Sequence, residues 1–132
     1  MDYEVVQPDD VDRIDLSQID EVPPDLDMAP IDELLDLEHL QAKIWYFQPG
    51  EEIAYHAHGE QEELYFVLEG EFSLKLGRSG ETEVREVGPG AFWVAKPEIG
   101  HGHRYLGDDE GAVLALGAPA VHDPGLDPHD LD

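Results

Sequence analysis

The stretch GEEIAYHAHGEQEELYFVLEG, residues 50–70, says most about the architecture of this chain of 132 residues. Residues 64–69 show the alternation of side chains that is typical of a half-buried β-strand, and Gly70 then allows a tight reversal. Ahead of this strand, His56 and His58 are two residues apart, so on a strand both imidazoles would face the same side. The stretch therefore predicts successive strands, with two histidines directed at one point.

Similar alternating segments extend in both directions from this stretch. They cover residues 40–46, 72–76, 82–87, 91–95 and 112–116, and glycine or proline separates them. Short strands at such close spacing predict an all-β sandwich or barrel over residues 38–118. The acidic N-terminal arm, residues 1–37, is predicted to contain a short helix over residues 27–37, because Pro30 lies near its start and apolar residues follow at helical spacing. The acidic C-terminal tail, residues 119–132, has no periodicity.

The charge is strongly acidic and lies mainly in these two flanks. The chain has 32 Asp and Glu residues against 7 Lys and Arg residues, for a formal net charge of −25. Arg13 is the only basic residue before Lys43, and none follows Arg104. Phosphates would be repelled, so we expect no nucleic-acid partner and no anionic-membrane partner. Dense carboxylates with scarce lysine favour a halophilic protein, and acidic arms around an ordinary domain are the alternative.

The sequence also lacks the marks of export and membrane insertion. No apolar run approaches the roughly 18 residues that a transmembrane helix needs, and the N-terminus lacks the basic and apolar regions of a signal peptide. The absence of cysteine rules out disulfides and thiolate chemistry. We therefore expect a cytoplasmic protein.

Two close pairs of histidines and one glutamate form the candidate site. Glu63 follows His58 by five residues, and His101 and His103 form the second pair. Imidazole nitrogens together with a carboxylate oxygen suit a divalent transition metal ion (Fe, Mn, Zn, Ni or Cu) better than Ca or Mg. The remaining histidines are interpreted as surface residues: His39, His122 and His129.

These residues resemble the first motif of the cupins, G-x5-H-x-H-x3,4-E-x6-G. Every fixed position is matched, by Gly50, His56, His58, Glu63 and Gly70. The resemblance covers about residues 38–118. It implies a jelly-roll barrel, or double-stranded β-helix, in which the two histidines and the glutamate are metal ligands.

The second cupin motif, G-x5-P-x-G-x2-H-x3-N, is matched less well. Without gaps, only Gly90 and His101 agree with it. A shift of one or two residues would instead align Pro97, Gly100 and His103. His101 is the preferred fourth ligand, and His103 stays the alternative because strand alternation places both on one face.

The resemblance further implies a homodimer and a small-molecule ligand. Three histidines and one glutamate leave coordination positions open, as a working metal site requires. The first hypothesis is a metal-dependent enzyme that acts on a small oxygenated metabolite, as a dioxygenase or an isomerase does. The second is a cupin that binds a sugar or another metabolite without turnover. Glu98 or Tyr105 could serve as a general acid or base. Eight aromatic residues could line the pocket, about half of them facing inward: Tyr46, Tyr55, Tyr65, Phe66, Phe72, Phe92, Trp93 and Tyr105.

Overall fold

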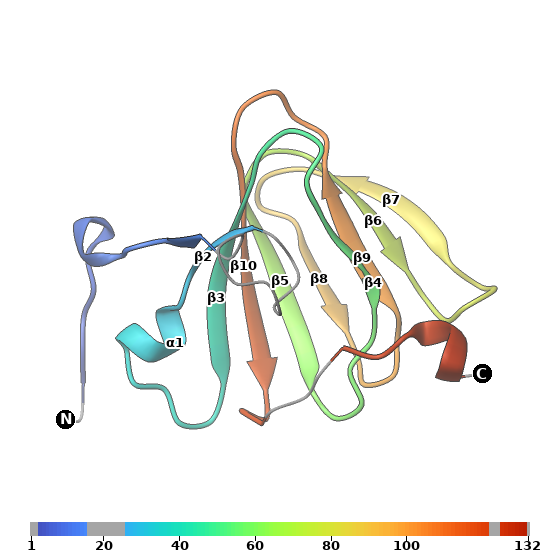
Figure 1. Ribbon diagram of the computed structural model, residues 1–132, viewed down its shortest axis with the longest axis horizontal. Helices are drawn as coiled ribbons and strands as arrows, with labels where there is room; N and C mark the ends of the chain where they lie inside the picture. Colours follow the sequence, from blue (N-terminus) through green and yellow to red (C-terminus); the bar gives the residue numbers. More distant parts are fainter. Residues whose placement is uncertain (1–2, 16–25, 122–124, 132) are drawn as a thin grey trace.

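Two antiparallel sheets form the body of the protein (Figure 1). The computed structural model describes residues 3–15, 26–121 and 125–131. The larger sheet has the strand order β1-β2-β3-β10-β5-β8, and the smaller one has the order β4-β9-β6-β7. From β3 to β10 the chain crosses between the sheets at every step except from β6 to β7, which confirms the predicted all-β jelly roll.

The boundaries of six strands, β3, β5, β6, β7, β8 and β10, follow the alternating segments of the sequence closely. The larger sheet contains β1 (Ile14–Asp15), β2 (Asp27–Ala29), β3 (Gln41–Phe47), β10 (Gly111–Ala118), β5 (Glu62–Glu69) and β8 (Phe92–Ala95). The smaller sheet contains β4 (Glu52–His56), β9 (His101–Tyr105), β6 (Phe72–Leu76) and β7 (Glu83–Val87). The helical elements are short: the 3-10 turns η1 (Pro8–Asp10) and η3 (Pro128–Leu131), and the helix α1 (Ile31–Leu34). No described helix is long and apolar enough to cross a bilayer.

The predicted helix over residues 27–37 is wrong in its extent. Helix α1 has a single turn and follows Pro30, while residues 27–29 form strand β2. This strand pairs with β3 and places Met28 opposite Trp45, where Met28 and Ala29 are buried. The open edge of β3 offers main-chain partners and an apolar surface, and this tertiary contact overrides the local helical signal.

The hydrophobic core lies between the two sheets. From the larger sheet, Tyr65 and Val67 of β5 and Val113 of β10 point inward and are almost fully buried. Phe72 and Leu74 of β6 meet them from the smaller sheet. Residues at the alternate positions of β5 and β8 point outward, so only part of the expected aromatic lining faces the interior, as alternation requires.

The described part of the C-terminal tail lies along the barrel beside β4 (Figure 1). Leu126 forms an antiparallel bridge with Ala57, with N···O distances of 2.9 and 2.7 Å. The segment ends in η3, where His129 Nδ1 contacts Ser79 Oγ in the turn between β6 and β7.

Candidate metal centre

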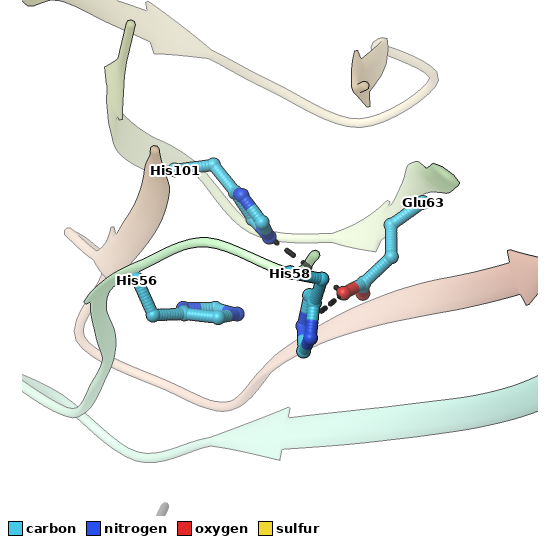
Figure 2. A group of neighbouring side chains, drawn as sticks. All are labelled: His56, His58, Glu63 and His101. Atoms are coloured by element: carbon cyan, nitrogen blue, oxygen red, sulfur yellow. Dashed lines mark ion pairs between the residues drawn. The ribbon is translucent and has the colours of Figure 1, made fainter. Parts of the chain in front are cut away.

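The structure brings His56, His58, Glu63 and His101 together at one mouth of the barrel (Figure 2). One possible ligand atom from each residue lies within 4.8 Å of the others. His56 ends β4 and His101 begins β9, and these two residues are direct cross-strand partners. Direct partners in an antiparallel pair present their side chains on the same face, which explains the ring separation of 4.2 Å.

Main-chain carbonyls fix the orientation of two of the imidazoles. His56 Nδ1 donates to the carbonyl oxygen of Ala54 at 2.7 Å, and His101 Nδ1 donates to that of Ile99 at 3.0 Å. A carbonyl oxygen can only accept, so Nδ1 carries the proton and Nε2 holds a lone pair in each ring. The Nε2 atom of His101 is buried and has no hydrogen-bond partner. Both rings thus direct a free lone pair into the cluster, as metal-binding histidines do.

Glu63 comes from the opposite sheet and is held by Tyr65. The Tyr65 hydroxyl donates to Glu63 Oε2 at 2.6 Å, and the two residues share the inward face of β5. The other oxygen, Oε1, contacts His58 Nε2 and lies 3.8 Å from His101 Nε2. Tyr65 therefore orients the carboxylate toward the imidazoles. The sequence pattern predicts Tyr65 only as a pocket wall; its position two residues after Glu63, on the same face of the strand, is the signal for this further role.

The dimensions of the cluster fit one metal ion after a small adjustment. Metal–ligand bonds of about 2.1 Å place adjacent ligand atoms about 3.0 Å apart and opposite ones about 4.2 Å apart. The His101–Glu63 distance of 3.8 Å lies within this range. The His58–Glu63 contact is shorter than the range, because these atoms share a hydrogen bond that a metal ion would replace. The donor set of three nitrogens and one oxygen suits a divalent transition metal.

The electrostatics of the cluster favour the protonation states that bind metals. Burial raises the pKa of Glu63, but the neighbouring His101 and His58 and the hydrogen bond from Tyr65 outweigh burial and lower the pKa well below its usual range. Burial, together with repulsion by the neighbouring His101, lowers the pKa of His56 to about 4. The carboxylate is thus ionised and the His56 imidazole neutral near pH 7, so neither must lose a proton to bind a cation.

His103 lies apart from the cluster, deeper in the barrel. It is 2% exposed and is packed against Phe47, Tyr65 and Trp93, with ring centroids 5.1–5.4 Å away. Neither of its ring nitrogens has a hydrogen-bond partner, and the same holds for Trp93 Nε1. Burial, followed by repulsion from His101 and His56, lowers the pKa of His103 to about 3. His101 rather than His103 therefore joins the cluster, and His103 is a neutral polar residue in an apolar wall.

The other candidates fall outside the cluster. The Glu98 side chain is exposed, while its main-chain N–H donates to the carbonyl oxygen of His58 at 2.6 Å and so supports that ligand. Tyr105 is buried against Phe72 in the core. Phe66 and Phe92 pack against each other on the outer face of the larger sheet, with ring centroids 4.4 Å apart and the ring planes tilted by 33°.

One glycine between the two histidines of β9 is required by close packing. A Cβ atom on Gly102 would lie 2.9 Å from the Tyr55 nitrogen and 3.0 Å from the Ile53 oxygen, both on the neighbouring strand β4. A larger residue would therefore separate β4 from β9, and with them His56 from His101.

Comparison with known proteins agrees with the architecture. The family model described as the cupin domain matches residues 43–117, more than half of the chain. A search of the curated proteins found no match.

Solved structures include several proteins with a similar fold. KdgF from Halomonas sp. is 23% identical, with a TM-score of 0.68, and the match covers 87% of this chain and 94% of that chain. A sugar phosphate isomerase from a cupin superfamily of Silicibacter pomeroyi is 18% identical, with a TM-score of 0.71, over 87% of this chain and 75% of that chain. A conserved protein with a double-stranded β-helix domain from Klebsiella pneumoniae is 25% identical, with a TM-score of 0.60, over 69% and 77% of the two chains.

Proposed function

Because the chain belongs to the cupin domain family, we propose that its barrel binds one divalent transition metal ion through His56, His58, Glu63 and His101 and acts on a small oxygenated metabolite. The observation that carries this proposal is the preset cluster: two Nε2 lone pairs and one oriented carboxylate directed at a common point. Building such a cluster is unfavourable without a cation, because it buries an ionised carboxylate and polar nitrogens away from water.

The chemistry depends on how the chain places its own groups. When bound, an ion of this class would act as a Lewis acid and polarise a substrate oxygen. The His58 and Glu63 side chains are each 14% exposed, whereas that of His101 is 2% exposed, so solvent and substrate approach from the side of His58 and Glu63. Tyr65 keeps the Glu63 carboxylate from turning away during that approach.

Two buried residues near His101 carry polar nitrogens. Trp93 Nε1 is a donor, and neutral His103 has one donor and one acceptor, all without partners among the described residues. Both side chains are almost fully buried, so these nitrogens give the interior near His101 a polar character. We assign a hydroxycarbonyl compound as the substrate class and isomerisation by proton transfer as the reaction, in keeping with the isomerase of similar fold.

Metal analysis and a proton-exchange assay test this function. Protein purified without an affinity tag is analysed for metals and then incubated with small hydroxycarbonyl compounds in D2O, where NMR detects exchange at the carbon next to the carbonyl. We expect one transition metal ion per chain and exchange that His56→Ala abolishes. The matched control is His39→Ala, because the His39 side chain is 94% exposed. Bound metabolite without exchange would indicate a binding protein, oxygen uptake would indicate a dioxygenase, and protein without metal would contradict the proposal.

We also propose that the protein pairs as a homodimer through the outer face of the larger sheet. Leu64, Leu68, Phe92 and Val94 are 39–64% exposed on the adjacent strands β5 and β8, and Phe66 lies between them. Exposed apolar patches of this kind mark interaction surfaces. A second copy carries the same net charge of −25, so it can approach closely only where charged groups are absent, as they are at these five positions.

We propose that the protein works in a cytoplasm of high salt concentration, because its composition is strongly acidic. Among the described basic residues, Arg13 forms a salt bridge with Glu110 and Lys43 forms one with Asp32. These two positive charges are therefore already neutralised by neighbouring carboxylates. The excess carboxylates repel one another unless dissolved ions screen them, and screening is strong in molar salt. In the domain organisation that we propose, 17 of the 32 acidic residues lie in the arms at residues 1–37 and 119–132, and the barrel at 38–118 carries the other 15.

A further inference from the structure

The C-terminal segment, residues 125–131, meets the barrel beside the candidate ligands. The ladder between β4 and β9 ends at the His56–His101 pair, so the next residue, Ala57, has left that ladder. Ala57 is instead bridged to Leu126, whose N–H donates to the Ala57 carbonyl at 2.7 Å and whose carbonyl accepts from the Ala57 N–H at 2.9 Å. Ala57 is fully buried. The tail thus pairs with the chain beyond β4 as a short strand would. It does so at Ala57, the single residue between His56 and His58.

Neighbouring contacts hold the segment on both sides of this bridge. A Cβ atom on Gly125 would lie 3.9 Å from the Cβ and Cδ2 atoms of His56, so Gly125 faces that side chain with room for about one methyl group between them. Further along, His129 contacts Ser79 and packs toward the Tyr55 ring, with centroids 6.1 Å apart. Tyr55 in turn donates its hydroxyl proton to the Gly77 carbonyl at 2.5 Å. The segment is therefore attached both at the metal-site end and at the β6–β7 turn.

We propose that this segment is a positioning element of the metal centre, with Leu126 as its positioning residue. The inference rests on the metal binding proposed above. His56 and His58 can face one point only if the main chain between them keeps an extended course beyond the end of β4. On one side, Glu98 holds the carbonyl of His58; on the other, Leu126 holds both polar main-chain groups of Ala57. Without Leu126, the main chain between the two imidazoles loses one of its restraints, and the ion must supply that part of the order when it binds.

A pair of substitutions at one position separates the main-chain role from simple covering of the surface. Leu126→Pro removes the N–H that donates to Ala57, whereas Leu126→Ala keeps both hydrogen bonds and removes most of the side chain. In the full-length protein, Co²⁺ affinity is measured by titration, and the visible d–d absorption of bound Co²⁺ reports ligand geometry. We expect Leu126→Pro to weaken Co²⁺ binding about tenfold and to change the spectrum, and Leu126→Ala to remain within about twofold of the wild type. Equal affinity and equal spectra for the proline variant and the wild type would overturn the proposal.

A reciprocal experiment uses the unmodified chain in case the proline variant does not fold. If the tail orders the ligands, the ligands must order the tail, because coupling between two sites acts equally in both directions. Zn²⁺ should therefore slow amide hydrogen exchange in the peptide that contains Leu126, by a factor similar to the loss in Co²⁺ affinity. Unchanged exchange there, with slowed exchange around His56, would overturn the proposal. A wild-type protein that binds neither ion would instead contradict the proposed function.

Discussion

Replacing Tyr65 by phenylalanine should weaken both the fold and the metal site, because one hydrogen bond serves both. The Tyr65 hydroxyl donates to Glu63 Oε2 at 2.6 Å, and the tyrosine is 2% exposed, so water cannot take over the bond. Hydrogen bonds to a charged group contribute about 1.5–3 kcal/mol. For a domain of this size, 1 kcal/mol corresponds to about 3–5 °C in melting temperature. We therefore expect the metal-free Tyr65→Phe protein to melt about 5–15 °C below the wild type.

The same substitution should lower metal affinity. Without the hydroxyl, the Glu63 carboxylate can rotate away from the imidazoles, and the ion must restrain it on binding. Loss of such a supporting hydrogen bond typically reduces affinity by about 10- to 100-fold. Isothermal titration calorimetry with Zn²⁺, in competition with a chelator of known affinity, gives the dissociation constant. The control is Tyr105→Phe, because Tyr105 is equally buried but packs on Phe72 in the core. A Tyr65→Phe protein with wild-type melting temperature and affinity within twofold of the wild type would refute the reasoning.

Three further predictions concern pH, association and salt. Burial lowers the pKa of His103 to about 3, so between about pH 6.5 and 3 the unfolded chain binds more protons than the folded chain. The free energy of unfolding should therefore fall as the pH drops through this range. His103→Phe should therefore flatten the acid side of the stability curve by up to about 1.4 kcal/mol per pH unit, measured by urea unfolding of the metal-free protein; an unchanged slope would contradict the assignment. Phe92→Glu should convert the proposed dimer to monomers in sedimentation velocity, whereas Val84→Glu, at a site of similar exposure on the smaller sheet, should not. The melting temperature should rise between millimolar and molar KCl, because salt screens the 32 acidic residues; a melting temperature indifferent to salt would argue for acidic arms on an ordinary domain.

Local pattern was sufficient to predict six of the strands and most of the cluster. Period-two alternation and glycine turns are properties of neighbouring residues, so β5, β6 and β7 could be located from the sequence alone. The spacing of His56, His58 and Glu63 matched a family motif, and the structure places these three residues together. Metal binding itself stays a prediction.

Features that depend on contacts between distant segments could not be predicted in the same way. Alternation places His101 and His103 on one face, but their Cα atoms are about 6.6 Å apart along a strand, which separates the mouth from the core. The register of β9 against β4 determines which one reaches the cluster: His101 faces His56, whereas His103 faces Ile53. Strand β2 and the bridge at Leu126 likewise arise from partners far away in the sequence, so neither left a local signal.

The candidate ligands are divided between the two sheets, since β4 and β9 supply histidines and β5 supplies the glutamate. An ion bound there would fasten one sheet to the other at the barrel mouth. At a free metal concentration 100 times the dissociation constant, such binding stabilises the fold by about 2.7 kcal/mol. Chains short of metal would open more often at that end and be degraded sooner. The abundance of the protein in the cell would then follow the supply of its metal, without any dedicated regulator.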